Sequence, residues 1–172
     1  TARYSSRKRR LMIVGAPGHD SDLGGKPDAG AAYVFERVAG AWVERQELTA
    51  GAGEAANAFF GDSVAIDGNR AVVGAYGAEA AYVFDLSGAW TLSQTLTATG
   101  GAGGDRFGCS VSVAHDTIAV GASYADAPAA ADAGALYVFQ PVGSFWAQVA
   151  RYQDTAATAA NEHLGASVAA GA

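Results

Sequence analysis

Short runs of alternating apolar and polar residues, separated by glycine-containing turns, dominate the sequence. In the clearest stretch four such runs follow one another: residues 63–66, 71–75, 80–85 and 90–97. A period of two, with many aromatic and β-branched residues, predicts β-strands. Asp67-Gly68-Asn69 and Ser87-Gly88 separate the runs and predict tight turns, because glycine and asparagine tolerate positive φ. Four residues of the last run are expected to share one face: Trp90, Leu92, Gln94 and Leu96.

This four-strand unit occurs three times along the chain. Four motifs recur in the same order: Tyr-Val-Phe (33–35, 82–84, 137–139), tryptophan (42, 90, 146), Phe-Gly or Leu-Gly (60–61, 107–108, 164–165) and Val-Gly-Ala (14–16, 73–75, 120–122). The period is 47 residues from Phe60 to Phe107 and 57 residues from Phe107 to Leu164. Four antiparallel strands in a repeat of about 40–50 residues are typical of a β-propeller blade, so we expect an all-β fold.

The motifs also resemble those of a known family. Phe-Gly-x-Ser-Val, Val-Gly-Ala, Gly-Ala-x-Tyr-Val-Phe and Gln-x-Leu-Thr-Ala are similar to the bacterial type of FG-GAP repeat. The resemblance covers nearly all of residues 11–172, with repeats at about 11–59, 60–106 and 107–163 and a closing first strand at 164–172. FG-GAP repeats resemble the propeller of integrin α-subunits, which implies blades arranged in a ring.

The two ends of the repeat region look like two parts of one blade. Residues 167–172 align with the first strand of the second repeat, and residues 9–15 align with the turn and strand that follow it. The chain therefore carries three blade-equivalents, whereas closed propellers typically have four or more. Two solutions remain open. Another chain closes the ring, with six blades in a homodimer, or further sequence completes it.

Charge is unevenly distributed along the chain. The net charge is -6, yet five of the eleven basic residues lie within residues 1–10, which we expect to form a basic, solvated arm. The acidic remainder would repel a phosphate backbone and argues against nucleic-acid binding. No apolar run approaches the ~20 residues of a membrane-spanning helix, so membrane insertion is not expected.

One loop, His19–Asp28, carries a candidate metal site. Counted from Asp20, positions 1, 3 and 9 are Asp20, Asp22 and Asp28, a spacing that favours calcium. Position 5, where a further oxygen ligand is usual, is Gly24, and a polar solvated loop is the alternative interpretation. Integrin-like repeats hold calcium between their first and second strands, where this chain has only short turns, so those sites are not carried over. Calcium is the only cofactor that the sequence suggests.

No catalytic arrangement emerges from the sequence. Ser63, Ser110 and Ser167 follow Gly-x, as in a nucleophile elbow, but they recur within a predicted strand and lack the helix that an elbow requires. We expect them to form hydrogen bonds within the blade. The glycine-rich segment 51–56 lacks the helix that a dinucleotide site requires. The protein is therefore expected not to be an enzyme.

These observations favour a binding or adhesion module, extracellular or on a bacterial cell surface, that contacts protein or cell-surface ligands through loops on one rim. Tyr124, Asp126 and Asp132 are expected on the same rim as the 19–28 loop, because both loops join the same two strands of a repeat. Two alternatives are a carbohydrate-binding propeller that uses the repeated tryptophans and a structural scaffold within a larger secreted protein. Tryptophans in register more often pack one blade on the next.

Overall fold

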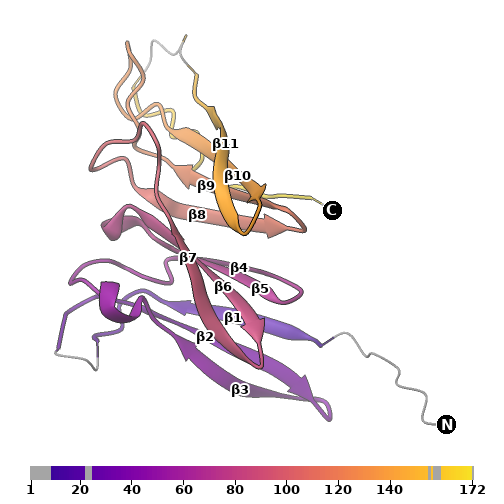
Figure 1. Ribbon diagram of the computed structural model, residues 1–172. Coiled ribbons are helices and arrows are strands. Elements are labelled where there is room, and N and C mark those ends of the chain that lie inside the picture. Colours follow the sequence, from indigo (N-terminus) through magenta and orange to yellow (C-terminus); the bar gives the residue numbers. More distant parts are fainter. Residues whose placement is uncertain (1–8, 22–24, 155, 157–159, 172) are drawn as a thin grey trace.

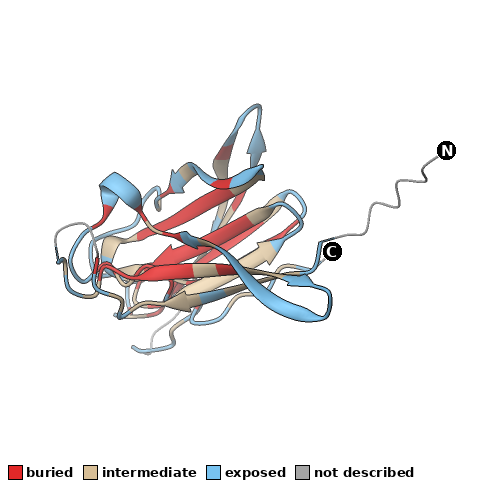
Figure 2. Ribbon diagram, turned by 90° about the horizontal axis from the view of Figure 1, so that it is seen from below, coloured by how far each residue is buried: buried red, intermediate tan, exposed pale blue. Residues whose placement is uncertain are grey.

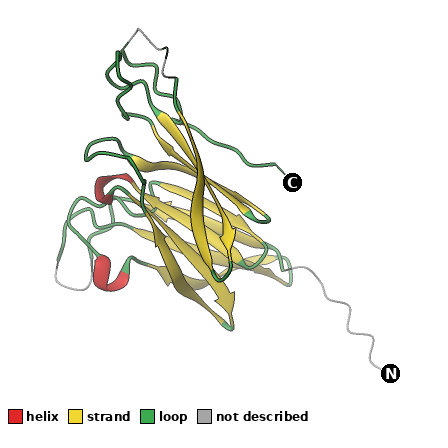
Figure 3. Ribbon diagram, turned by 45° about the horizontal axis from the view of Figure 1, so that its top comes forward, coloured by secondary structure: helices red, strands yellow, loops and turns green. Residues whose placement is uncertain are grey.

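A computed structural model describes residues 9–21, 25–154, 156 and 160–171 (Figure 1). These residues form three antiparallel sheets and two short 3-10 helices, η1 (Gly51–Gly53) and η2 (Tyr76–Ala78). The strands are β1 (Leu11–Ala16), β2 (Ala31–Val38), β3 (Ala41–Leu48), β4 (Ser63–Asp67), β5 (Arg70–Ala75), β6 (Ala80–Ser87), β7 (Ala89–Leu96), β8 (Phe107–Ala114), β9 (Thr117–Ala122), β10 (Ala135–Val142) and β11 (Phe145–Tyr152). The described part of the chain contains no α-helix, which confirms the all-β prediction (Figure 3).

Each sheet is one blade. Blade 1 consists of β1–β3, blade 2 of β4–β7 and blade 3 of β8–β11, and within each blade consecutive strands are neighbours. Blades 2 and 3 have the expected four strands, and the four runs predicted from the sequence match β4–β7 to within about two residues. Blade 2 lies between the other two, and the three sheets do not close into a ring (Figure 1).

The outer strand of each blade contains a β-bulge, which overturns one sequence prediction. In blade 2, Phe84 pairs with Leu92 and Val83 pairs with Gln94, so Ser93 is an extra residue. The bulge reverses the alternation, because side chains before and after the extra residue point to opposite faces. Trp90 therefore packs toward blade 1 and Leu96 toward blade 3, while Leu92 is exposed. The expectation that these side chains share one face was wrong.

The core lies between the blades. One cluster joins blades 1 and 2 and includes Val34, Leu48, Phe60 and Trp90. A second cluster joins blades 2 and 3 around Phe107 and its neighbours. In Figure 2 the buried segments occupy the middles of the strands, and the hairpin ends are exposed. We call the side of a blade that packs on the preceding blade its leading face, and the opposite side its trailing face.

Glycines let neighbouring blades approach backbone to backbone. A Cβ on Gly74 would collide with the carbonyl oxygen of Gly108 in the next blade, and Gly121 stands in the same relation to Gly165. The repeated serines contribute here. The Ser63 hydroxyl donates to the Gly108 carbonyl (2.8 Å) and the Ser110 hydroxyl to that of Gly165 (2.6 Å). For these two serines the acceptors lie outside the serine's own blade, so the prediction of hydrogen bonds within the blade was wrong for Ser63 and Ser110. For Ser167 it stays a prediction.

Segment 164–171 follows blade 3 and begins with the same kind of bridge that precedes blade 2. Leu164 makes a single parallel bridge with Gly134, as Phe60 does with Gly30 one junction earlier. Residues 165–171 form no strand in this single chain, although the Ala170 amide donates to the Ser112 hydroxyl (2.9 Å). The predicted closing strand concerns pairing with another chain, and it stays a prediction.

Candidate ligand-binding rim

Two long loops define one end of the molecule, which we call the loop rim. Residues 17–30 connect β1 to β2, and residues 123–134 connect β9 to β10. In blade 2 the corresponding connection is shorter and is formed by η2 and Glu79. Both long loops lie on the same side of the blades, opposite the tight hairpin turns (Figure 1). The rim position expected for Tyr124, Asp126 and Asp132 therefore agrees with the fold.

The aspartates of these loops hold the loop backbone. The Asp132 amide donates to Asp126 Oδ1 (2.9 Å), and the Asp28 amide donates to Asp20 Oδ1 (3.1 Å). Asp28 and Asp132 both have positive φ, of 51° and 53°. The two pairs make the same kind of contact in blades 1 and 3: the first aspartate of each loop accepts the amide of the last and helps to close the loop.

The calcium prediction stays untested. Asp20 and Asp28 lie in the same loop, and Asp22 lies outside the described residues. Among the residues that the structure describes, no group of three histidine, cysteine, aspartate or glutamate side chains could hold a metal ion. One oxygen of Asp20 already accepts the Asp28 amide, so a cation there would use the remaining carboxylate oxygens.

The first long loop is anchored to the linker that follows blade 1. The Ser21 hydroxyl donates to the carboxylate of Glu54, and both residues are buried. Lys26 Nζ donates to the Glu54 carbonyl (2.7 Å). A buried carboxylate needs such donors, because an isolated buried charge is costly. Glu54 therefore fixes the conformation of this loop, a role that the sequence analysis did not assign.

A continuous run of aromatic and cationic side chains crosses the loop rim. We call it the rim stack: Phe59, Tyr76, Arg106, Tyr124 and His163. The rings of Phe59 and Tyr76 are stacked with centroids 5.0 Å apart. The Arg106 guanidinium lies 5.4 Å from the Tyr76 ring centroid and 3.9 Å from that of Tyr124. Tyr124 in turn contacts His163, at 4.9 Å between centroids.

The rim stack was missed because its members are far apart in sequence and differ in type. Phe59, Arg106 and His163 each directly precede the Phe-Gly or Leu-Gly motif and have positive φ. The position before the Phe-Gly or Leu-Gly motif therefore recurs in every repeat, but a different residue type occupies it each time, so no motif marks it. His163 Nδ1 also lies 2.9 Å from the Ser123 carbonyl, which orients its ring on Tyr124.

Asp62 lies beside the rim stack and has a perturbed pKa. Partial burial of the carboxyl raises the pKa of Asp62 above its ordinary value, and the positive charge of Arg106 partly offsets this. Asp62 as a residue remains solvent-exposed, so the shift has little consequence for stability.

In blade 2, where the long loop is absent, Glu79 contacts the segment that leads into the next blade. Its carboxylate accepts the backbone amides of Gly104 (3.0 Å), Arg106 (2.9 Å) and Phe107 (2.8 Å). The equivalent position is Gly30 in blade 1 and Gly134 in blade 3, each bridged directly to the next segment. A side chain thus makes in blade 2 the contact that backbone makes in its neighbours.

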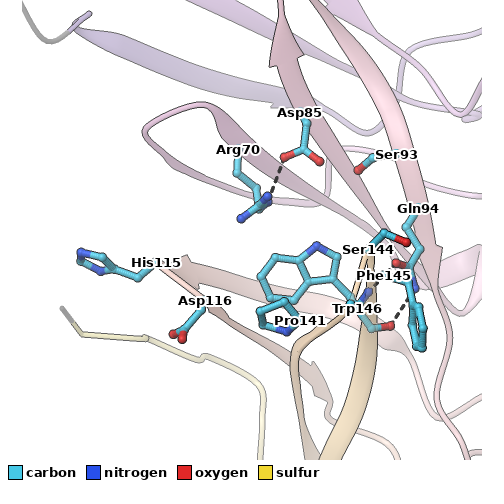
Figure 4. Close-up of a pocket in the computed structure, with 11 residues that line it drawn as sticks. Arg70, Asp85, Ser93, Gln94, His115, Asp116, Pro141, Ser144, Phe145 and Trp146 are labelled. Carbon is cyan, nitrogen blue, oxygen red and sulfur yellow. Dashed lines mark hydrogen bonds and ion pairs between the residues drawn. The ribbon is translucent and has the colours of Figure 1, made fainter.

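The repeated tryptophans are mostly packing residues. Trp90 and Trp146 are buried, as the packing interpretation predicts, whereas Trp42 is exposed. A cavity of about 300 Å³ lies beside Trp146, between blades 2 and 3 (Figure 4). There the Arg70 guanidinium, paired with Asp85 at 2.9 Å, lies 4.7 Å from the Trp146 ring centroid. The face of Trp146 that borders the cavity is therefore covered by the Arg70 side chain.

Comparison with known proteins gives one family. The family model described as "FG-GAP repeat" matches residues 42–84 and 90–139, together more than half of the chain. Each match begins at the outer strand of one blade and ends in the third strand of the next. No curated protein matches the chain.

Proposed function

The chain belongs to the FG-GAP repeat family, and from this premise we propose that it is a non-catalytic binding or adhesion module of the β-propeller type. The loop rim makes the contact, and a protein or cell-surface ligand is bound there. The rim stack is the observation that carries this proposal, because it presents aromatic and arginine side chains from two blades and both linkers on one surface.

Tyrosine and arginine are the side chains that protein interfaces favour. They combine large apolar area with donors, and hot spots are enriched in both. Arg106 and Tyr124 already hold each other, so little conformational entropy is lost when a partner covers them. The flanking aspartate loops supply acidic neighbours, and calcium bound to the 19–28 loop would add a cation at the edge of this surface.

The proposal also includes location and assembly. Extracellular or cell-surface localisation accords with the family. None of the helices in the described residues is long and apolar enough to cross a membrane. The three unclosed blades belong to a larger ring, completed by another chain or by further sequence.

A glycan ligand is less well supported than a protein ligand. Sugar-stacking pockets between blades require an open tryptophan face, and Trp146 is covered by Arg70. Of the three tryptophans only Trp42 is exposed, and it lies on the leading face of blade 1, away from the loop rim.

Surface plasmon resonance with the immobilised chain tests the function. The probes are a panel of purified extracellular-matrix proteins and a glycan array. We expect at least one protein to bind, with affinity about tenfold lower for Arg106→Ala or Tyr124→Ala. Asp116→Ala, at an exposed hairpin turn of the opposite rim, is the control. Binding of glycans alone, or equal losses in Asp116→Ala, would contradict the proposal.

Calcium binding is tested separately by isothermal titration calorimetry with calcium chloride. We expect binding heat from the wild-type chain and its loss in Asp28→Asn, with Asp132→Asn as the matched control in the other long loop. Absence of heat from the wild-type chain would favour the alternative, a polar loop closed by its own hydrogen bonds.

A further inference from the structure

Arg106 differs from the arginines that form ion pairs within the chain. Arg45 and Arg70 each donate from Nε to a carboxylate at 2.9 Å. Arg106 is exposed, and within the described residues its guanidinium has no carboxylate or carbonyl partner; its contacts are the rings of Tyr76 and Tyr124. A guanidinium carries five N–H donors, so this one has its hydrogen bonds available for a group outside the chain.

Two carboxylates lie near Arg106, and neither pairs with its guanidinium. Glu79 accepts three backbone amides, one of them the amide of Arg106 itself (2.9 Å). Asp62 is exposed and interacts with Arg106 electrostatically, but the two do not form an ion pair. The positive charge on this part of the rim is therefore open to an anion from outside.

Tyr76 and Tyr124 hold the guanidinium of Arg106 in place. The guanidinium carbon lies 3.9 Å from the ring centroid of Tyr124 and 5.4 Å from that of Tyr76. Both tyrosines are half-buried, and each is supported from its other side, Tyr76 by Phe59 and Tyr124 by His163. A guanidinium held in this way loses little conformational entropy on binding, and its planar fork matches the two oxygens of a carboxylate.

The surroundings favour a single carboxylate over a polyanion. Asp126 follows two residues after Tyr124 and is exposed, Asp62 lies beside Arg106, and the net charge of the chain is -6. A sulfated glycan or a nucleic acid carries many negative charges at short spacing, which these aspartates would repel. One acidic side chain in an otherwise uncharged segment meets the cation with far less repulsion.

An apolar surface borders the cation on one side. The rings of Phe59 and Tyr76 are stacked with an interplanar angle of 5°, and both residues are only half-buried. A partner that places an acid on Arg106 can therefore lay a neighbouring aromatic or aliphatic side chain on these rings, where apolar area is removed from water. The rim stack thus suits a ligand segment in which an acid stands beside an apolar residue.

We propose that the rim stack is a carboxylate-binding site. The guanidinium of Arg106, held between Tyr76 and Tyr124, binds an aspartate or glutamate side chain of a protein partner through two parallel N–H···O hydrogen bonds. An apolar residue beside that acid packs on Phe59 and Tyr76. The inference rests on the proposed function and names the chemical group that the loop rim recognises.

A random peptide library displayed on phage is selected on the full chain, with Arg106→Gln as the counter-selecting protein. We expect the recovered peptides to share an aspartate or glutamate beside an apolar residue. Fluorescence anisotropy then compares a recovered peptide with its amide counterpart, in which asparagine or glutamine replaces the acid. The amide peptide should bind the wild-type chain about tenfold more weakly, because a charge-assisted contact is lost, and both peptides should bind Arg106→Gln about equally.

Three further variants separate this contact from general effects. Arg106→Lys keeps the charge without the planar fork and should retain part of the preference for the acid. Phe59→Ala should weaken acid and amide peptides alike. Arg37→Gln, an exposed arginine near the β2–β3 hairpin of the opposite rim, should change neither. Circular dichroism of Arg106→Gln should match the wild type, because the bond from the main-chain amide of residue 106 to Glu79 remains.

Three results would overturn the inference: recovered peptides without an acidic residue, equal affinity of the acid and amide peptides for the wild-type chain, or binding of heparin with the same dependence on Arg106. If a matrix protein binds the loop rim while no acid-dependent peptide is recovered, the proposed function stands and the carboxylate assignment fails. Acid-dependent peptide binding without binding of any matrix protein would count against the proposed function alone.

Discussion

The two rims of this molecule are built in opposite ways. Toward the hairpin turns, both internal junctions use the same contact, which we call the Gln clasp. The side chain of Gln46 or Gln94 donates to the carbonyl and accepts the amide of a buried tryptophan in the next blade. On the loop rim, each junction uses different residues. Phe59 stacks on Tyr76 at one junction, and Arg106 lies between two tyrosines at the next. The repeated contacts hold the blades together, and the residues that vary between junctions lie on the rim that we propose as the binding surface.

The largest effect is expected where backbone meets backbone. In Gly74→Ala the new Cβ meets the Gly108 carbonyl and the Ser63 hydroxyl, so the free energy of unfolding should fall by about 3 kcal/mol or more. Urea denaturation measures the loss. Gly103→Ala is the control, because no atom lies within 4 Å of the added Cβ. Equal midpoints for the two variants would show that the blades can move apart at no cost.

The second largest loss of stability is expected on removal of the Glu79 carboxylate, which makes the contact that backbone makes in blades 1 and 3. Glu79→Ala leaves three backbone amides without their acceptor and should cost about 2 kcal/mol, since the lost hydrogen bonds are charge-assisted. Chemical denaturation provides the value, with Asp116→Ala, an exposed turn residue, as the comparison. A change below about 0.5 kcal/mol would mean that water replaces the carboxylate fully.

The Gln clasp should contribute a smaller and repeated amount. Gln46→Ala and Gln94→Ala each remove a two-bond contact to a tryptophan main chain and should each cost about 1–2 kcal/mol. The two losses should be equal within about 0.5 kcal/mol and additive, because the residues lie at different junctions. Thermal or urea unfolding of the single and double variants measures this. Strongly unequal losses would break the comparison between the two junctions.

The smallest effect at neutral pH concerns one buried hydroxyl. Tyr137 is fully buried, and within the described residues its hydroxyl finds no partner at good hydrogen-bond geometry, so Tyr137→Phe should change stability by less than about 1 kcal/mol, in the favourable direction. Burial raises the pKa of Tyr137 above its ordinary value, although the charge of Arg151 and a weak hydrogen bond from it oppose the shift. Ionisation is thus harder in the folded than in the unfolded state, and stability falls as pH rises above 10.

Tyr137→Phe should therefore flatten the alkaline part of the stability profile, measured by urea denaturation between pH 9 and 11. Burial also raises the pKa of Tyr82, so Tyr82→Phe should flatten it too and serves as the matched variant. A wild-type profile that is level above pH 10 would contradict both expectations.

The blades were predictable from the sequence because their signals are local and repeated. Tyr-Val-Phe and Val-Gly-Ala place the third and second strands in register three times, and the turns between them contain glycine. The bulge at Ser93 was not predictable from the alternation, because both faces of β7 pack on a neighbouring blade. Trp90 and Leu96 therefore keep an unbroken alternation in the sequence while they lie on opposite faces.

The rim was predictable only in outline. Equivalent loops join equivalent strands, so Tyr124 and Asp126 were expected on the correct side. The contacts of Arg106 and Glu79 could not be anticipated, because each depends on a distance between blades rather than on spacing within one. Phe59 and Arg106 occupy the same position of the repeat but differ in residue type. Such a variable position within a conserved repeat pattern is the sequence signal that would have pointed to the rim stack.

The reversal of faces in the outer strand has a consequence for how the protein unfolds. β7 contributes Trp90 to the junction with blade 1 and Leu96 to the junction with blade 3. Unfolding of either outer blade therefore exposes part of blade 2. Repeat proteins are often described as stacks of semi-independent modules with interface energies between them. Here the modules share a structural element, so the array should lose its order in a single cooperative transition instead of blade by blade.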